Sequence, residues 1–296
     1  ILPGRSMMAI KMTDAQKGVS LAILSALFYC LISVCVKWIG GALPTMEIVF
    51  FRALVMLLVG SGSMVLRHQK LGRKHRFLLI LRGLSGAMGA FTYYAALAMI
   101  PLAETMALVN LSPFIVSILA GLFLKEEIRR NHLLALLISF AGALCIIRPT
   151  FEGVGAGYLV AFASAVITGC SYTLVRKLKH DVDTPTIVFY YNVVSILVAF
   201  PVMLMGGFVM PVGAEWFKLV CLGLAALLFN QLNTSAYQYA AAGKISIYNY
   251  LSIIFSAVFG SFLWNEHLIL GTGIGIALIL TGAALSFWSG REDRRS

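Results

Sequence analysis

The strongest candidate for chemistry in this sequence is an arginine inside a long apolar stretch. Arg52 lies about six residues into that stretch, roughly 9 Å from its start if the segment is helical. Ionisable side chains in apolar surroundings are costly and often functional. The Arg52 guanidinium could therefore recognise a carboxylate or a phosphate on a bound solute. A structural pair with Glu47, Glu104 or helix-end carbonyls is the open alternative.

Tyrosine and amide side chains recur within the other apolar stretches. Polar groups in such surroundings must face partners or a water-filled path. An amide is not easily satisfied within its own helix, so we expect Asn110, Asn230, Gln231 and Asn249 to line one cavity. The candidate solute-binding residues are Arg52, Tyr29, Tyr93, Tyr94, Asn110, Tyr172, Tyr191, Asn192, Asn230, Gln231, Asn233, Tyr237, Tyr248 and Asn249.

The remaining charged residues of interest lie nearer the ends of apolar stretches. We expect Arg82 to extend its side chain to the lipid headgroups, and Lys37 and Arg176 to act as interfacial anchors. Glu126 and Glu266, which are 140 residues apart at the ends of two apolar stretches, are expected to fix loops. Glu104 is expected to stabilise a helix N-terminus through the helix dipole.

Small residues predict close helix packing and bending. Gly83, Gly86 and Gly89 are three apart, and Gly271, Gly273, Gly275 and Gly282 form a second group, so both should give smooth faces. Pro113 removes a backbone hydrogen bond within an apolar stretch. The candidate hinge residues are Pro113, Gly86 and Gly89.

Several kinds of chemistry lack the residues that they need. The five histidines fall in loops or at the ends of apolar stretches, so an enzyme's catalytic cluster is not expected. The five cysteines, without CxxC spacing, are interpreted as packing residues, and no metal or cofactor is predicted. The absence of a deep Asp, Glu or His favours facilitated diffusion over proton exchange, which stays open.

The composition indicates which kind of fold holds these residues in place. Of 296 residues, 60% are hydrophobic and 12% charged, and the mean hydropathy is +0.90, which is typical of an integral membrane protein. Helices of about 20 residues cross a bilayer. Ten such stretches occur, at 18–39, 46–66, 77–98, 103–123, 132–148, 156–175, 184–205, 217–239, 244–264 and 268–289.

Basic residues predict the orientation. The net charge of +11 comes from short clusters between apolar stretches, so no nucleic-acid surface is expected. Most Lys and Arg residues fall in alternate loops, whereas Lys37, Arg148 and Lys218 fall in the others. Because cytoplasmic loops retain basic residues, both termini are predicted to be cytoplasmic.

The chain also repeats itself at an offset near 140. GLSGAMGAF from Gly83 aligns with GLAALLFNQ from Gly223, and Ser112 aligns with Ser252. Each half carries five predicted spans. Because five is an odd number of spans, the two halves cross the membrane in opposite orientations. Such inverted repeats commonly enclose a binding site near the midplane of the membrane.

These features resemble the EamA-type carriers of the drug/metabolite transporter superfamily. The resemblance covers essentially the whole chain and rests on the Pro44-to-FFRALVMLL segment, the block from Tyr93 to Ile128, and its echo ending in FGSFLWNEHL. Within the family the chain is similar to bacterial amino-acid and metabolite exporters, with kinship to solute carrier family 35 G. The resemblance implies a cavity surrounded by eight spans, with the fifth and tenth outside it.

The sequence therefore predicts an all-α integral membrane protein with ten transmembrane helices in two inverted five-helix repeats around a central cavity. Residues 1–17 form the cytoplasmic N-terminus, of which 1–6 look like a cloning remnant, and residues 18–148 and 149–289 form the repeats, followed by a cytoplasmic C-terminus at 290–296. We expect a bacterial inner-membrane transporter, monomeric or loosely dimeric, that contacts lipid. Its expected solute is an amino acid-like zwitterion or anion, moved by alternating access. Nucleotide-derived, flavin-like or amine solutes, proton antiport, an embedded enzyme and a lipid scramblase are the alternatives.

Overall fold

A computed structural model provides the structure of the chain. It describes residues 13–39, 42–72, 74–97, 99–100, 102–127, 130–147, 149, 155–179, 181–264 and 270–292. Throughout these ranges the regular secondary structure is helical. The helices are α1 (Asp14–Ile39), α2 (Thr45–Leu66), α3 (Arg76–Leu97), α4 (Leu102–Val109), α5 (Ser112–Leu124), α6 (Arg130–Ile147), α7 (Gly155–Lys177), α8 (Thr184–Met205), α9 (Ala214–Tyr239), α10 (Ala242–Ile247), the 3₁₀ turn η2 (Tyr248–Tyr250), α11 (Leu251–Trp264) and α12 (Leu270–Glu292).

Nine helical segments in these ranges are long and apolar enough to cross a membrane. They confirm a multi-pass membrane protein and follow nine of the ten predicted stretches, with α4 and α5 sharing one span, as do α10 and α11. The remaining predicted stretch corresponds to α3, which has a comparable length but contains two arginines and several glycines and tyrosines that lower its hydropathy. The tenth span therefore stays a prediction.

Two of the spans are interrupted near their middle. Between α4 and α5 the chain turns at Asn110 and Leu111, and Pro113 lies in the first turn of α5, where a missing backbone N–H is tolerated. Between α10 and α11 the interruption is the turn η2. The Tyr250 hydroxyl donates to the Asn110 carbonyl oxygen at 2.7 Å, so the two interruptions contact each other.

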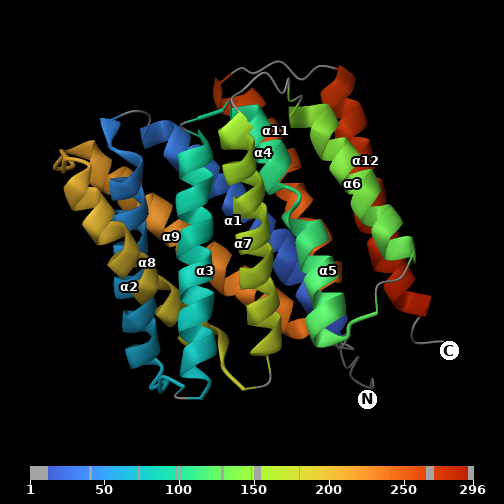
Figure 1. The fold of residues 1–296 in the computed structure, drawn as a ribbon, viewed down its shortest axis with the longest axis horizontal. Coiled ribbons are helices and arrows are strands. Elements are labelled where there is room, and N and C mark those ends of the chain that lie inside the picture. Colours follow the sequence, from blue (N-terminus) through green and yellow to red (C-terminus); the bar gives the residue numbers. More distant parts are fainter. Residues whose placement is uncertain are drawn as a thin grey trace, which may run out of the picture.

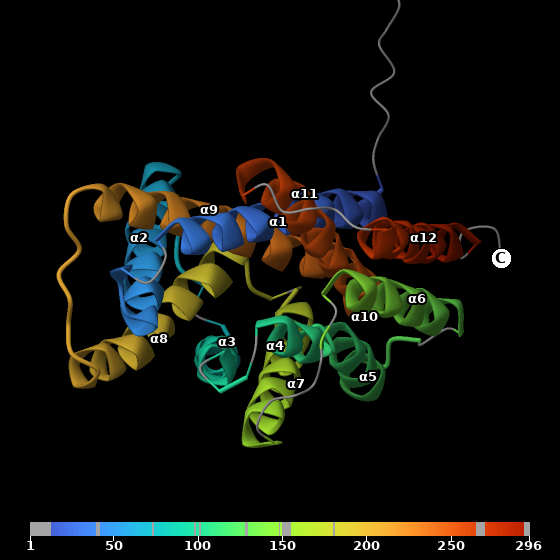
Figure 2. The same ribbon diagram turned by 90° about the horizontal axis from the view of Figure 1, so that it is seen from above.

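The helices pair in a regular pattern. Extensive packing joins α1 to α9, α3 to α7, α2 to α8 and α6 to α12. Seen from above, α6 and α12 lie side by side at one end of the molecule, while α2 and α8 lie toward the other (Figure 2). The interrupted spans and α7 stand between these ends (Figure 1).

Glycine allows the closest of these approaches. A Cβ on Gly142 would lie 2.6 Å from the carbonyl oxygen of Gly275, so α6 and α12 touch through their backbones. Gly273 has no atom within 4 Å of the corresponding position. The prediction that Gly273 shares a face with Gly275 was wrong, because residues two apart point to nearly opposite sides of an α-helix.

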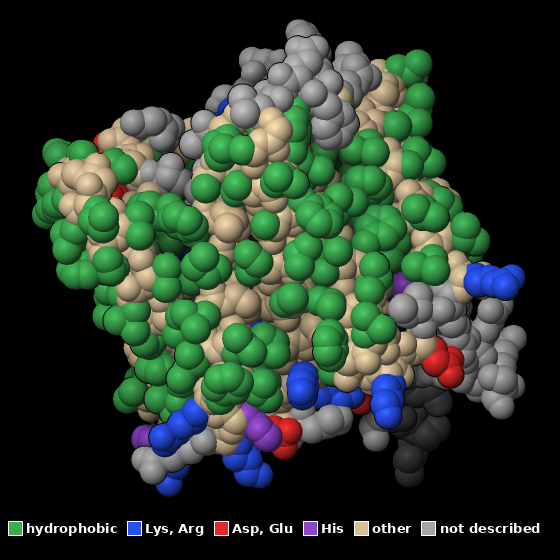
Figure 3. Space-filling view, viewed as in Figure 1, with side chains coloured by type: hydrophobic (Ala, Val, Ile, Leu, Met, Phe, Trp, Pro, Cys, Tyr) green, Lys and Arg blue, Asp and Glu red, His purple; other side chains and the backbone are tan. Residues whose placement is uncertain are grey.

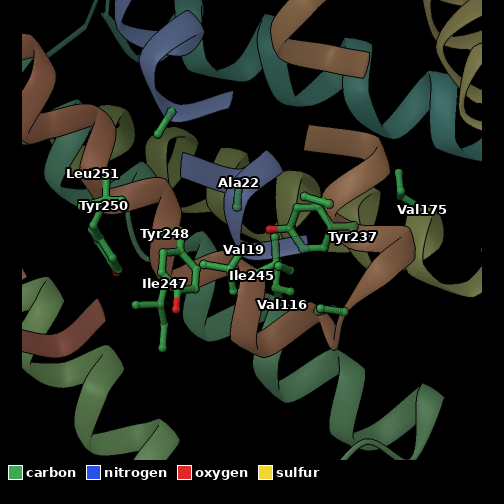
Figure 4. Close-up of a cluster of buried hydrophobic side chains, with 14 of the residues drawn as sticks. Val19, Ala22, Val116, Val175, Tyr237, Ile245, Ile247, Tyr248, Tyr250 and Leu251 are labelled. Atoms are coloured by element: carbon green, nitrogen blue, oxygen red, sulfur yellow. The ribbon is translucent and has the colours of Figure 1, made fainter. Parts of the chain in front are cut away.

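The largest buried cluster lies where several helices meet. Val19 and Ala22 of α1, Val116 of α5 and Tyr237 of α9 converge with residues of α10 and η2 (Figure 4). Outside this core, large apolar side chains such as Leu122 and Phe123 remain more than 70% exposed. Exposure of that extent suits contact with lipid tails.

Charge is distributed unevenly over the molecule. On the face seen in Figure 3, hydrophobic side chains cover the body, and Lys, Arg and His side chains gather along the lower edge. The start of α1 and the end of α12 lie on this lower side in Figure 1. The arrangement follows the sorting of basic residues into alternate loops.

Candidate functional site

A pocket between the two interrupted spans is the main candidate site. Its empty volume, counted with the solvent at its open side, is about 640 Å³. Its walls come from α1, α3, α4, α5, α7, α9, η2 and α11, and not from α6 or α12. The lining residues are Ala26, Tyr29, Tyr93, Met106, Val109, Asn110, Ser112, Thr168, Tyr172, Phe229, Asn249, Ser252 and Ile253.

Aromatic rings form one side of this pocket. The Tyr29 ring lies 5.1 Å from that of Phe229, and Tyr172 stacks on Tyr237 with centroids 4.9 Å apart at 12°. Asn249 of η2 donates its amide to the Tyr237 hydroxyl at 3.3 Å. Such a wall can hold an apolar or aromatic group against hydrogen-bonding neighbours.

The expectation about amides needs correction. Asn110 donates its side-chain amide to the Met106 carbonyl at 2.7 Å, and Asn230 donates to Ala226 at 2.9 Å. Both are satisfied in part within their own helices, because a short side chain reaches the carbonyl one turn earlier. Asn110 nevertheless lines the main pocket, while Asn230 does not.

A second space of about 220 Å³ lies between α2, α8 and α9. Asn192 and Gln231 line it together with apolar residues of α2. The prediction that Asn110, Asn230, Gln231 and Asn249 line one cavity was therefore wrong for Gln231. Asn192 and Gln231 belong to a separate space, because α2 and α8 pack at the side of the bundle.

Arg52 lines a third space, of about 320 Å³, between α2, α3 and α8. Its Nη2 lies 3.5 Å from the Tyr191 hydroxyl, to which it donates. Glu47, one of the suggested partners, accepts the Val209 backbone N–H at 2.6 Å on the α8–α9 loop. Arg52 and Tyr191 thus form a polar contact inside the bundle but outside the main pocket.

Arg82 is the functional candidate that sequence reasoning missed. Its side chain is 4% exposed, and its guanidinium carbon lies 4.8 Å from the centroid of the Tyr191 ring. The expectation that Arg82 extends to the headgroups was wrong, since it points between α3 and α8. A signal was present: Gly86, one turn later, leaves the space that the guanidinium occupies.

Other predicted site residues lie around or away from these spaces. Asn233 is buried in α9, within hydrogen-bonding reach of Tyr172. Tyr248 faces α12, where its hydroxyl donates to the Ala283 carbonyl at 3.4 Å, so it serves packing there. Tyr94 belongs to α3, but its side chain is outside the described part of the structure, as are the side chain of Glu104 and all of Glu266.

The candidate hinge residues lie at helix contacts. Gly86 faces Tyr191 of α8, and Gly89 faces Thr168 of α7, with the Ser164 hydroxyl donating to the Gly89 carbonyl at 2.9 Å. Pro113 is buried beside the interruption of the α4–α5 span. Their role in motion stays a prediction.

A polar cluster closes the end of the bundle near the α5–α6 loop. Arg176 donates its Nε to Glu126 Oε1 at 2.7 Å and its Nη1 to the carbonyls of Tyr237 and Gln238. The second Glu126 oxygen accepts the Ala242 backbone N–H at 2.9 Å. The prediction that Glu126 fixes a loop is supported by this geometry. The prediction of Arg176 as a headgroup anchor was wrong, because it is 12% exposed and ion-paired.

A family model described as the EamA-like transporter family matches residues 16–148 and again residues 155–288. A solved crystal structure superposes with a TM-score of 0.82 at 21% sequence identity, covering 93% of this chain and 98% of the other, which shows a shared fold.

Relatives by sequence are transporters. The pseudopaline exporter CntI of Pseudomonas aeruginosa is 33% identical over 258 residues, which cover 85% of this chain and 89% of the exporter. Solute carrier family 35 member G1 of Mus musculus is 26% identical, covering 92% of this chain and 79% of the relative. A riboflavin transporter of Rhizobium johnstonii is 25% identical, covering 93% and 92%.

Proposed function

The chain belongs to the EamA-like transporter family and is a multi-pass membrane transporter rather than an enzyme, and from this premise we propose that it carries a small organic metabolite by alternating access. The proposed solute is an amino acid-like zwitterion or anion. The observation that carries the proposal is the 640 Å³ pocket, where tyrosines, two amides and small hydroxyls meet at two interrupted spans.

The pocket chemistry supports a solute with both apolar and polar parts. Tyr29, Tyr93 and Phe229 offer aromatic surface, while Asn110, Asn249 and the serines and threonine offer hydrogen-bonding groups. Arg52, which lies outside this pocket in the space between α2, α3 and α8, supplies a cation that suits a carboxylate. A deep carboxylate that would pair with an amine-type cation is not found among the described side chains, whose acidic members lie at helix ends or in loops.

Two inverted five-helix halves are part of this proposal, with boundaries at residues 18–148 and 149–289. The family model matches each half separately. The two interruptions are separated by the same offset of about 140 residues as the sequence repeat. The pairings α1 with α9 and α3 with α7 are interchanged by a two-fold relation between the halves, and α2–α8 and α6–α12 map onto themselves. In such proteins the site lies at the repeat interface.

Motion between the halves would expose the pocket to one side at a time. The interruptions at Asn110 and at η2 lack continuous helical hydrogen bonding and are natural places for bending. The Glu126–Arg176 cluster joins the ends of α5, α7, α9 and α10, so it would have to separate for the pocket to open there. We place this end in the cytoplasm, with both termini, and the protein in a bacterial inner membrane.

A flavin-like solute is the second candidate. Its support is the aromatic wall of the pocket together with the relatives named riboflavin transporters. Facilitated diffusion is proposed for the energetics, because the described acidic residues are not at mid-membrane depth. Proton antiport is the alternative that the flux experiment decides.

The test combines binding with transport. Purified protein is screened by thermal shift against amino acids, nucleosides, riboflavin and amines, and stabilising solutes are then assayed for flux into proteoliposomes. We expect an amino acid-like zwitterion or anion among the hits, and Arg52→Gln to lower its flux about tenfold, since a charged hydrogen bond is worth roughly 1.5–3 kcal/mol. Arg130→Gln, at an exposed helix end, is the control.

Three outcomes would count against this proposal. If no solute moves faster than through empty liposomes, the transport activity itself is contradicted. If Arg52→Gln leaves flux unchanged, Arg52 does not bind the solute. Accumulation against the solute gradient only under an imposed pH difference would replace facilitated diffusion with proton antiport.

A further inference from the structure

Arg82 carries a buried charge without a hydrogen-bonded counter-ion. Its side chain is 4% exposed, and Nε and Nη1 have no hydrogen-bond partner among the described residues. It lies six residues after Arg76, roughly 9 Å along α3. An uncompensated buried charge destabilises the protein that holds it. A residue retained at such a cost points to a partner that binds during function.

The surroundings form a slot for the guanidinium. Tyr191 of α8 covers one side at 4.8 Å, and α7 lies beside the slot, since the Ser171 hydroxyl donates to the Arg82 carbonyl oxygen at 3.4 Å and Tyr172 is the next residue. On α3 itself, a Cβ at Gly86 would collide with Nη1 of Arg82 and with the Tyr191 ring. The glycine is therefore required for the side chain to lie in this position.

Acidic residues do not approach the slot in the described part of the chain. The two most buried ones are engaged elsewhere, Glu47 with the Val209 N–H and Glu126 with Arg176. The Tyr191 ring gives a cation–π contact, which compensates only part of the lost solvation. The site is thus suited to an anion supplied from outside the protein.

The same tyrosines connect the slot to the two larger spaces. Tyr172 lines the 640 Å³ pocket, so Arg82 lies behind a pocket wall. The Tyr191 hydroxyl accepts a hydrogen bond from Arg52, which lines the 320 Å³ space. A small movement of Tyr172 or Tyr191 would open the guanidinium to a solute in the pocket.

We propose that Arg82 binds the carboxylate of the transported metabolite, in the slot between α3, α7 and α8. The planar guanidinium pairs with a carboxylate through two parallel hydrogen bonds, which replace the contact with the Tyr191 ring. Arg52 holds the Tyr191 hydroxyl, and so positions the ring over Arg82 while the pocket is empty. This inference rests on the proposed transport of a zwitterion or anion, and it adds Arg82 to Arg52 as a residue that recognises the solute.

The experiment compares ligands that differ only in the carboxylate. Thermal unfolding of purified protein is measured with phenylalanine against phenylalaninamide, which lacks the α-carboxylate, and with glutamate against glutamine, which lacks only the side-chain carboxylate, for wild type, Arg82→Gln and Arg82→Lys. Arg76→Gln is the matched control, because Arg76 is exposed on the same helix. Sodium chloride at equal ionic strength shows whether an inorganic anion gives the same effect.

We expect wild type and Arg76→Gln to bind phenylalanine more tightly than phenylalaninamide, or glutamate more tightly than glutamine, by about tenfold or more. Arg82→Gln should lose this preference, and Arg82→Lys should keep part of it. Without ligand, Arg82→Gln should melt at the same temperature as wild type or higher, because the variant no longer buries an unpaired charge.

Other results overturn the inference. These are equal binding of both members of each pair by wild type, a preference that persists in Arg82→Gln, and stabilisation by chloride as large as that by the carboxylates. A lower melting temperature of ligand-free Arg82→Gln, or failure of both variants to fold, would make Arg82 a structural residue. In each case, flux of another solute by the wild-type protein would leave the proposed transport function intact. If the wild-type protein moved no solute, both the transport function and the role of Arg82 would be contradicted.

Discussion

At the scale of single residues, chemical type does not decide what a polar side chain does inside the bundle. Arg52 and Arg82 lie at similar distances from the starts of their helices, yet one lines a space beside α2 and the other is covered by Tyr191. Asn110 both lines the main pocket and bonds its own helix. Direction around the helix axis, rather than depth along it, separates these roles.

Glycine gives a prediction at this scale. Gly275→Ala should lower the free energy of unfolding by about 1–3 kcal/mol, because its Cβ would lie 2.5 Å from the Gly142 carbonyl oxygen on α6. Gly273→Ala is the control on the same helix, since its Cβ would meet no atom within 4 Å. Thermal unfolding in detergent measures both, and equal melting temperatures would contradict the close approach of α6 and α12.

At the scale of elements, the two interrupted spans and the cluster at their ends organise the pocket. Lys125 adopts a left-handed φ of 54° where α5 ends, and Glu126 follows directly. The Glu126 carboxylate then reaches Arg176 at the end of α7 and the first backbone N–H of α10, that of Ala242. One carboxylate thus links three elements that are distant in sequence.

This link predicts an energetic coupling. Glu126→Ala and Arg176→Ala should each destabilise the protein, and together they should cost less than the sum by about 1–3 kcal/mol, because the partly buried pair is lost only once. A double-mutant cycle on melting temperatures measures the coupling. Glu127→Ala, the exposed neighbour, should have little effect; strict additivity of the pair would refute the link.

At the scale of the whole molecule, the uneven distribution of charge sets the proposed orientation. Basic side chains gather at the end where α1 begins and α12 ends (Figures 1 and 3). The loop between α8 and α9, at the other end, contains Val212, which is 73% exposed. Because cytoplasmic loops retain Lys and Arg, the two ends should face different compartments.

Single cysteines test this orientation. In a variant with the five native cysteines replaced by alanine, Val212→Cys should react with an impermeant maleimide added to spheroplasts, whereas Lys70→Cys should react only after the membrane is opened. Labelling is measured by the mass shift on a gel. The reverse pattern would place the termini outside.

Much of the architecture could be predicted from sequence because it depends on local properties. Nine spans follow from apolar length alone, and the interruption beside Pro113 follows from a proline that cannot continue a helix's hydrogen bonding. The tenth stretch, at α3, falls short in hydropathy because it contains Arg82 and the glycines beside it. Arg82, which lowers the hydropathy of this span, is also the residue that we propose to bind the solute.

The sequence alone indicated that Arg52 lies inside an apolar stretch and that a charge in such a place needs a partner. The tertiary structure alone decided which of two arginines is enclosed, which amides share a pocket, and that Arg176 meets Glu126 instead of lipid. Hydropathy sums over a segment and carries no direction, whereas burial depends on the rotation of each helix against neighbours far away in the chain. Sequence therefore determined the membrane fold and its family, and packing determined the site.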